Sequence, residues 1–102
     1  MFNTADVIII GGGVHGASLA FQLAKRGTQV IVLDKKFIAS GATGRSSGLV
    51  RMHYATEVDS NLAWASFRCF RNWKEIVGGS CGFTRTGFIQ IVDSKYIPAL
   101  KT

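Results

Sequence analysis

Three glycines and one acid near the start of the chain carry the clearest chemical signal. Gly11, Gly13 and Gly16 stand in the spacing G-x-G-x-x-G, and Asp34 follows about 20 residues beyond them. The first glycine permits a tight turn, the second lets the backbone approach a diphosphate, and the third lets a helix pack closely on a strand. The carboxylate can accept hydrogen bonds from both ribose hydroxyls, and it would repel a 2′-phosphate of the NADP type. The pattern predicts a site for the ADP half of a dinucleotide.

A strand, a helix and a second strand must position these residues, and the sequence supplies all three. Asp6 to Ile10 is an apolar run that predicts a strand, and Val14 to Arg26 predicts a helix that stops at Gly27. Gln29 to Leu33 predicts the second strand, which ends at Asp34. The helix would direct its first amide groups and its positive dipole end at the diphosphate. The expected fold class is α/β, with a Rossmann-like βαβ unit. A glycine-rich turn that only packs a helix on a strand would leave the acid unexplained.

Size and composition narrow the class of protein further. The chain has 102 residues, of which 47% are hydrophobic, and this suits one small globular domain. It has no apolar run long enough to span a bilayer and no signal-peptide pattern at its start. Cys69 and Cys81 stand in no metal-binding or redox spacing. We therefore expect reduced thiols, a cytoplasmic location and no metal site.

The net charge of +6 raises the question of nucleic acid as a partner. Basic and aromatic residues are interleaved in one predicted helix, which Ser60 or Asn61 would cap and which would run to about Val77. An amphipathic helix with its bases in solvent explains this pattern better than a nucleic-acid interface does. The interleaved residues are Arg68, Arg71 and Lys74 with Phe67, Phe70 and Trp73. The expected buried stripe consists of Leu62, Ala65, Cys69, Trp73 and Ile76.

The rest of the chain departs from a simple nucleotide-binding fold. Residues 40–48 form a polar stretch of glycine, serine and threonine with one arginine, where NAD-binding folds usually continue with another crossover. Residues 83–85 and 88–92 predict two short strands, and 96–102 predicts the start of a helix. Two parallel strands with one crossover helix bury too little to stand alone. We therefore expect the chain to be the N-terminal part of something larger, or to assemble with other chains.

Three segments together resemble a known family. They are DVIIIGGGVHGASLAFQLAKRG, VIVLDK and GATGRSSGLVRMHY. They are similar to the D-amino-acid oxidase superfamily of flavoproteins, in the branch of sarcosine oxidase β-subunit, dimethylglycine dehydrogenase and glycine oxidase. The polar loop and the arginine after it are more specific for this family than the glycine turn is. The resemblance implies FAD as cofactor and a larger two-domain flavoprotein, with residues 1–102 in its FAD-binding domain and 83–92 as the first strands toward the substrate domain.

The family also implies an activity and roles for individual residues. The activity is oxidation of a secondary or tertiary amine or amino acid, such as sarcosine, glycine or dimethylglycine, by hydride transfer to FAD. Arg51 would bind the substrate carboxylate, with Arg45 as the alternative and a structural salt bridge as the plainer role for Arg51. No catalytic acid, base or nucleophile is identified. The residues that would bind the cofactor are Gly11, Gly13, Val14, His15, Gly16, Asp34, Lys35, Thr43, Gly44, Arg45, Ser46, Ser47 and Gly48.

The expected partners are a small amine or amino-acid substrate and the remainder of the flavoenzyme or its partner subunits. Two other interpretations stay open at this point. A non-catalytic module that binds ADP-like ligands would suit the short chain. An NAD-binding Rossmann protein would share the glycine turn, although the polar loop after Asp34 counts against it.

Overall fold

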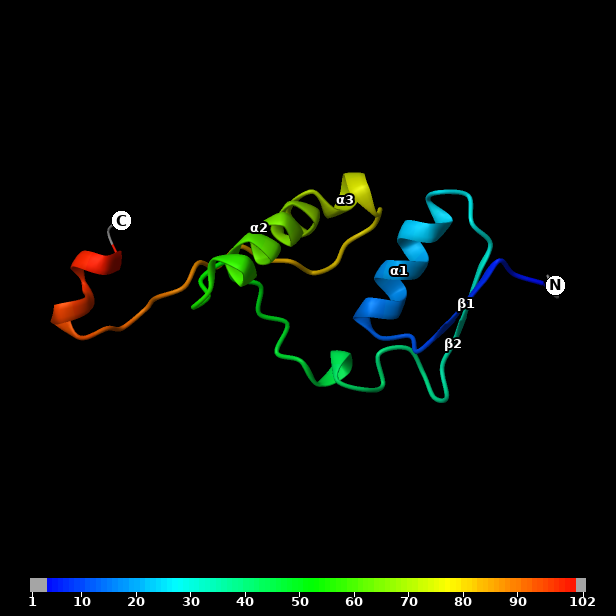
Figure 1. Ribbon diagram of the computed structural model, residues 1–102, viewed down its shortest axis with the longest axis horizontal. Helices are drawn as coiled ribbons and strands as arrows, with labels where there is room; N and C mark the ends of the chain where they lie inside the picture. The colour runs from blue at the N-terminus through cyan, green and yellow to red at the C-terminus, as the bar shows by residue number, and fades with distance from the viewer. Residues whose placement is uncertain (1–3, 101–102) are drawn as a thin grey trace. The chain divides into compact units, whose positions relative to one another are not determined.

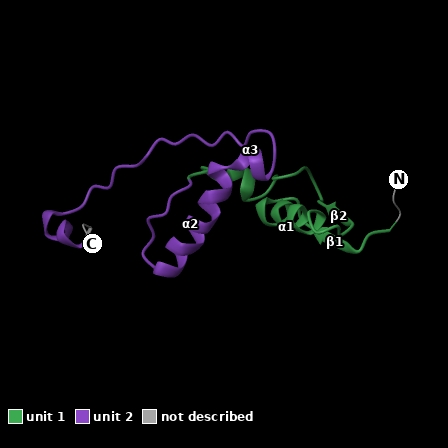
Figure 2. Cartoon of the chain, turned by 90° about the horizontal axis from the view of Figure 1, so that it is seen from above, with its two compact units in different colours: residues 1–49 green, residues 50–102 purple. Residues whose placement is uncertain are grey.

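The computed structural model describes residues 4–100, which fall into two compact units divided after Leu49 (Figure 2). The first unit contains strand β1 (Val7–Ile10), helix α1 (Val14–Ala24), strand β2 (Val30–Leu33) and a short 3-10 turn, η1 (Thr43–Arg45). The two strands are parallel and pair from Val7 with Val30 to Ile10 with Leu33. Figure 1 shows α1 beside this pair, so the predicted βαβ unit is confirmed.

Helix α1 packs on β1 through one buried side chain and one close backbone approach. Among residues 4–100, Ile9 is the one hydrophobic residue that is buried, with 7% of its surface exposed. A Cβ atom added to Gly16 would lie 3.3 Å from Ile9 Cγ2 and would collide with the carbonyl oxygen of Gly11. The absence of a side chain at Gly16 therefore lets α1 sit directly on β1, as the third glycine of the motif predicts.

Helix α1 ends two residues before the predicted end at Arg26. Arg26 N–H donates to Leu23 O at 2.9 Å, and Gly27 N–H donates to Ala24 O at 2.9 Å. Gly27 has a φ of +83°, a left-handed conformation that favours glycine. The chain thus leaves the helix through a tight turn that brings it to β2.

The second unit contains α2 (Glu57–Arg71), α3 (Trp73–Ile76) and the 3-10 turns η2 (Ser94–Tyr96) and η3 (Pro98–Leu100). The prediction that this helix is capped by Ser60 or Asn61 is wrong. Thr56 is the N-cap residue, and its hydroxyl oxygen accepts a hydrogen bond from Asp59 N–H at 3.1 Å. Thr56 and Asp59 stand three residues apart, a spacing that lets the cap and the third helical residue satisfy one another.

The buried stripe of α2 also differs from the prediction, because Phe83 packs on another side of the helix. The Phe83 ring lies 5.8 Å from that of Phe67 and 6.0 Å from that of Phe70. These two rings are half-buried. The predicted stripe is correct in part: Cys69 and Trp73 are half-buried, whereas Leu62, Ala65 and Ile76 are exposed. The interleaved arginines 68 and 71 are exposed, which agrees with an amphipathic helix.

The two short strands predicted at 83–85 and 88–92 are not formed. Residues 80–93 have no assigned helix, strand or turn, and Ile89 and Ile91 are 92% and 93% exposed. A strand needs a partner to complete its hydrogen-bond ladder, and an isolated hairpin is marginal in water. The helix predicted at 96–102 is replaced by η2 and η3, and its last two residues lie outside the described part of the chain. Within residues 4–100, none of the helices combines the length and apolarity needed to cross a bilayer.

Candidate cofactor site

The glycine turn joins β1 to α1 at the end of the two-stranded sheet. Gly11 has a φ of +107°, and its N–H donates to Leu33 O at 2.7 Å, which extends the pairing of the strands by one residue. Gly13 is the N-cap residue of α1 and has no side chain that could accept a hydrogen bond from the first amides of the helix. The first turn of α1 also contains no acidic residue. The positive end of the helix dipole is therefore not neutralised by a carboxylate of its own first turn.

Asp34 lies just beyond the end of β2 and reaches back to this turn. Its Oδ2 accepts a hydrogen bond from Gly12 N–H at 2.7 Å, and its Oδ1 accepts one from Lys36 N–H at 2.9 Å. These bonds, the Gly12 amide foremost, lower the pKa of the Asp34 carboxyl below its ordinary value of 3.8. The group is exposed and ionised at neutral pH. A carboxylate oxygen has two acceptor positions, so each can still accept a ribose hydroxyl.

The polar loop after Asp34 folds back over the glycine turn. Ala39 N–H donates to Gly12 O at 3.0 Å. Thr43 Oγ1 accepts a hydrogen bond from Val14 N–H at 3.0 Å and so takes one of the first amides of α1. Gly44 N–H donates to Ala39 O at 2.9 Å, which closes the loop on itself. These contacts bring a segment about 30 residues away in the sequence to the start of the helix.

A groove of about 400 Å³ lies where these parts meet. Its lining comes entirely from the first unit, and it combines both strand ends, the glycine turn, the acid and the polar loop. The lining residues are Ile10, Gly11, Gly13, Leu33, Asp34, Lys35, Ser40, Gly41, Ala42 and Thr43. A Cβ atom at Gly13 would lie 3.1 Å from Thr43 Oγ1 and would narrow the groove. An exposed backbone, a helix N-terminus and an ionised acid are the groups that an adenosine diphosphate requires, so these residues fit the ADP half of a dinucleotide such as FAD or NAD.

The structure gathers some of the predicted cofactor residues and leaves others outside the groove. Five of them line it: Gly11, Gly13, Asp34, Lys35 and Thr43. Val14, His15 and Gly16 form the first turn of α1, and His15 is exposed. Gly44 and Arg45 belong to η1, and neither they nor residues 46–48 line the groove. Sequence reasoning missed the groove-lining roles of Ser40, Gly41 and Ala42. Their signal was present, because they belong to the same glycine- and serine-rich stretch.

Arg51, the predicted substrate-binding residue, lies in the second unit. Its guanidinium carbon is 5.2 Å from the centre of the Tyr54 ring, within reach of a cation–π interaction. The side chain is exposed, and among residues 4–100 it makes no ion pair. The neighbouring His53 contacts the Phe88 ring, with the ring centres 5.8 Å apart. The role of Arg51 toward a substrate stays a prediction.

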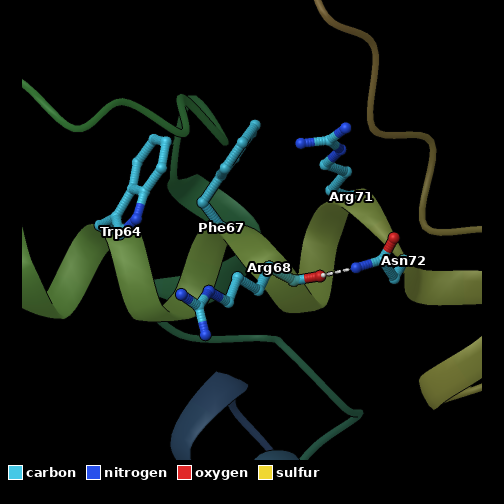
Figure 3. A pocket seen from close by; sticks show the side chains of 5 residues that line it. All are labelled: Trp64, Phe67, Arg68, Arg71 and Asn72. Atoms are coloured by element: carbon cyan, nitrogen blue, oxygen red, sulfur yellow. Dashed lines mark hydrogen bonds between the residues drawn. The ribbon is translucent and has the colours of Figure 1, made fainter.

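A second hollow, of about 480 Å³, lies along α2, and its lining residues differ from those that bind a dinucleotide. Figure 3 shows Trp64, Phe67 and Arg71 on one side of the helix, with Arg68 directed to the other. Asn72 closes one end, and its side-chain amide donates to Arg68 O at 3.1 Å. This hollow contains neither a glycine turn nor an acid that could hold a nucleotide, and among the described residues no cluster could ligate a metal ion.

Comparison with known proteins decides between the cofactors that the groove could accept. The family model described as FAD dependent oxidoreductase, DAO, matches residues 6–102. The chain belongs to this family. FAD is therefore its cofactor class, and the interpretation as an NAD-binding protein is not retained. No solved structure gives a significant match.

Curated relatives carry several different activities in their names. The beta subunit of sarcosine oxidase from Rhizobium meliloti is 49% identical over 51 residues, which are 48% of this chain and 12% of that protein. Human mitochondrial dimethylglycine dehydrogenase is 32% identical over 90 residues, which are 87% of this chain and 10% of that protein. A component of the anaerobic glycerol-3-phosphate dehydrogenase of Escherichia coli K12 is 53% identical over 48 residues, which are 47% of this chain and 9% of that protein. The chain spans about a tenth of the length of the curated relatives it matches.

Proposed function

We propose that this chain is the FAD-binding N-terminal portion of a two-domain flavoenzyme that oxidises a small secondary or tertiary amine or amino acid. The groove of the first unit is the observation that carries the proposal. It brings Asp34, the glycine turn and the polar loop together within the first unit. The family match supports FAD and an oxidoreductase, and the relatives named for sarcosine and dimethylglycine support an amine substrate.

In the proposed complex, different residues of the groove would contact different parts of FAD. Asp34 would accept the ribose hydroxyls of the adenosine, and Lys35 would line the adenine side. The backbone at 11–16 would hold the diphosphate, which the positive end of α1 favours. Residues 43–48 would follow the ribityl chain toward the flavin ring. The hydrogen bond from Val14 N–H to Thr43 Oγ1 supports this assignment, because it ties that loop to the diphosphate end of the site.

The proposed role of Arg51 is to bind the carboxylate of an amino-acid substrate. A guanidinium presents two parallel N–H donors to a carboxylate, and this fixes the orientation of the substrate as well as its position. The Tyr54 ring restricts the guanidinium, and among residues 4–100 no acid neutralises it. When bound, FAD would supply the acceptor for the hydride that leaves the carbon next to the substrate nitrogen. This chain's residues would orient that carbon, and the resulting imine would be hydrolysed by water.

The remaining parts of the proposal concern the larger protein. Residues 83–92 would become the first strands toward the substrate domain when partner strands are present, either from the rest of the flavoenzyme or from a different polypeptide. The alternative of a non-catalytic module that binds ADP-like ligands has one observation in its favour, because the whole groove lies within residues 10–43. The cytoplasmic location stays a prediction.

An anaerobic reduction assay tests the substrate class. The complete flavoenzyme that contains this chain is loaded with FAD and mixed in turn with sarcosine, dimethylglycine and glycerol 3-phosphate, and the visible absorption of the oxidised flavin is followed. We expect the amines to remove this absorption and glycerol 3-phosphate to leave it. Reduction by glycerol 3-phosphate alone would contradict the amine assignment, and reduction by none of the three would favour the non-catalytic module.

A further inference from the structure

Ala39 adopts a backbone conformation that no other described residue except glycine adopts. Its φ is +63°, in the left-handed region, and every other positive φ among residues 4–100 belongs to a glycine. A side chain makes this region unfavourable for an L-residue, and such strained positions gather where a site must be held in one geometry. Ala39 lies at the point where the chain from β2 enters the polar loop.

The backbone of Ala39 connects the glycine turn to the polar loop through both of its polar groups. Its N–H donates to Gly12 O at 3.0 Å, and its carbonyl oxygen accepts from Gly44 N–H at 2.9 Å. A Cβ atom at Gly44 would collide with this carbonyl oxygen, so position 44 must remain glycine for the contact to form. Gly12 also donates to Asp34 Oδ2 at 2.7 Å. Ala39 therefore links Gly12, the residue that also contacts the acid, to the loop that lines the groove.

We propose that Ala39 is a positioning residue of the FAD site, and that its left-handed backbone holds the 40–43 wall of the groove against the glycine turn. This inference rests on the function proposed above. Four consecutive residues after Ala39, Ser40 to Thr43, line the groove, and Thr43 then contacts the first amide of α1. With Ala39 in a right-handed or extended conformation, its two hydrogen bonds could not point to Gly12 and Gly44 together. The wall would then have no fixed position.

This role makes a prediction that depends on backbone preference and not on side-chain size. Glycine and asparagine both tolerate the left-handed region, although asparagine is much larger than alanine. Valine is branched at Cβ and is an outlier there. If Ala39 served only to fill space, both Ala39→Gly and Ala39→Asn would weaken the site. If its backbone conformation matters, only Ala39→Val would do so.

Titration of the full chain with FAD and with ADP tests the proposal, with flavin fluorescence and calorimetry as readouts. We expect Ala39→Gly and Ala39→Asn to change both Kd values by less than ~3-fold, and Ala39→Val to raise both by ~10-fold or more, in proportion to the strain at such a position. Ala55→Val, the same change at a residue outside the left-handed region, is the control and should match the wild type. Wild-type affinity in Ala39→Val, or a large loss in Ala39→Gly and Ala39→Asn, would overturn the proposal.

The design separates this inference from the proposed function. If the wild-type chain binds neither FAD nor ADP, the proposed function itself fails. If it binds both and the variants follow residue size instead of backbone tolerance, only the role of Ala39 fails. Should Ala39→Val not fold, the Gly and Asn variants still decide the question, because both must then bind like the wild type.

Discussion

Asp34 Oδ2 accepts a hydrogen bond from Gly12 N–H at 2.7 Å, across 22 positions of sequence. The acid at the end of β2 therefore holds the turn that follows β1, in addition to facing the groove. This contact joins two parts of the motif that are usually considered separately, the glycines and the ribose-binding acid. The geometry of the turn and the charge beside it depend on the same carboxylate.

Replacing Asp34 should weaken FAD binding for two reasons. Asp34→Ala removes the acceptor for the ribose hydroxyls and leaves Gly12 N–H without its partner. Hydrogen bonds to a charged group contribute enough that the Kd for FAD should rise about 10- to 100-fold. A flavin fluorescence titration measures this. Asp93→Ala, which removes an exposed acid paired with Lys95 in the second unit, is the control and should leave the Kd unchanged. Equal Kd values for Asp34→Ala and the wild type would remove Asp34 from the site.

The lowered pKa of Asp34 predicts how stability depends on pH. Hydrogen bonds from Gly12 and Lys36 favour the ionised form in the folded chain, so the unfolded chain takes up this proton at a higher pH than the folded chain does. The contribution is thus fully present above the ordinary pKa of 3.8 and is lost as pH falls through the lowered folded value. Thermal unfolding from neutral pH to about pH 2 should show a smaller acid loss in Asp34→Asn than in the wild type. Parallel curves for the two proteins would contradict this.

The same substitution should destabilise the chain at Gly16 and have little effect on stability at Gly41. A Cβ atom at Gly16 would collide with Gly11 O, whereas one at Gly41 would meet nothing within 4 Å. Gly16→Ala must push α1 away from β1, at a cost of about 1–3 kcal/mol in the free energy of unfolding. Gly41→Ala should be near neutral. Chemical denaturation compares the two, and equal midpoints would mean that α1 does not pack on β1 as described.

The Thr43 hydroxyl should contribute to cofactor binding through its contact with α1. Thr43→Val keeps the shape of the side chain but removes the acceptor for Val14 N–H. One neutral hydrogen bond corresponds to a rise of about two- to tenfold in the Kd for FAD. Thr43→Ser retains the hydroxyl and is the matched variant. If the serine and valine variants bind FAD equally, the loop is not held by this bond.

Arg51 should act on substrate binding more than on turnover. Arg51→Ala would remove the two-pronged donor, so KM for an amino-acid substrate should rise about 10- to 100-fold while kcat changes less. Arg51→Lys keeps the charge without the planar geometry and should fall between. Steady-state kinetics with an amine that lacks a carboxylate provides a second comparison, since that substrate should not distinguish the variants. Arg68→Ala, an exposed arginine of α2, should behave as the wild type. An unchanged KM in Arg51→Ala would contradict the assignment.

The parts of the fold that could be predicted from sequence are those with a local signature. Glycine spacing, apolar runs and an acid at a set distance identify β1, α1, β2 and the groove they form. Thr56 also has such a signature, because an acid stands three residues after it, but Ser60 and Asn61 are equally suitable N-cap residues by type. The alternation of aromatic and basic residues indicates an amphipathic helix, but the buried face expected from it is correct only at Cys69 and Trp73.

The features that escaped prediction depend on contacts between distant residues. The covered face of α2 is decided by Phe83, which lies beyond the helix. The segment 83–92 has the composition of strands but, within residues 4–100, no partner strand with which to pair. The left-handed conformation of Ala39 has no sequence signal, since alanine ordinarily avoids it. Its importance follows from its hydrogen bonds to Gly12 and Gly44, which join residues far apart in the sequence.

Identification of the nucleotide that co-purifies with the chain tests the central claim most directly. The purified protein is denatured, and the released cofactor is examined by absorption spectrum and mass. We predict FAD in the wild type and a sharply reduced amount in Asp34→Ala. A colourless protein that binds NADH but not FAD would contradict the account, as would flavin content that is indifferent to the loss of Asp34.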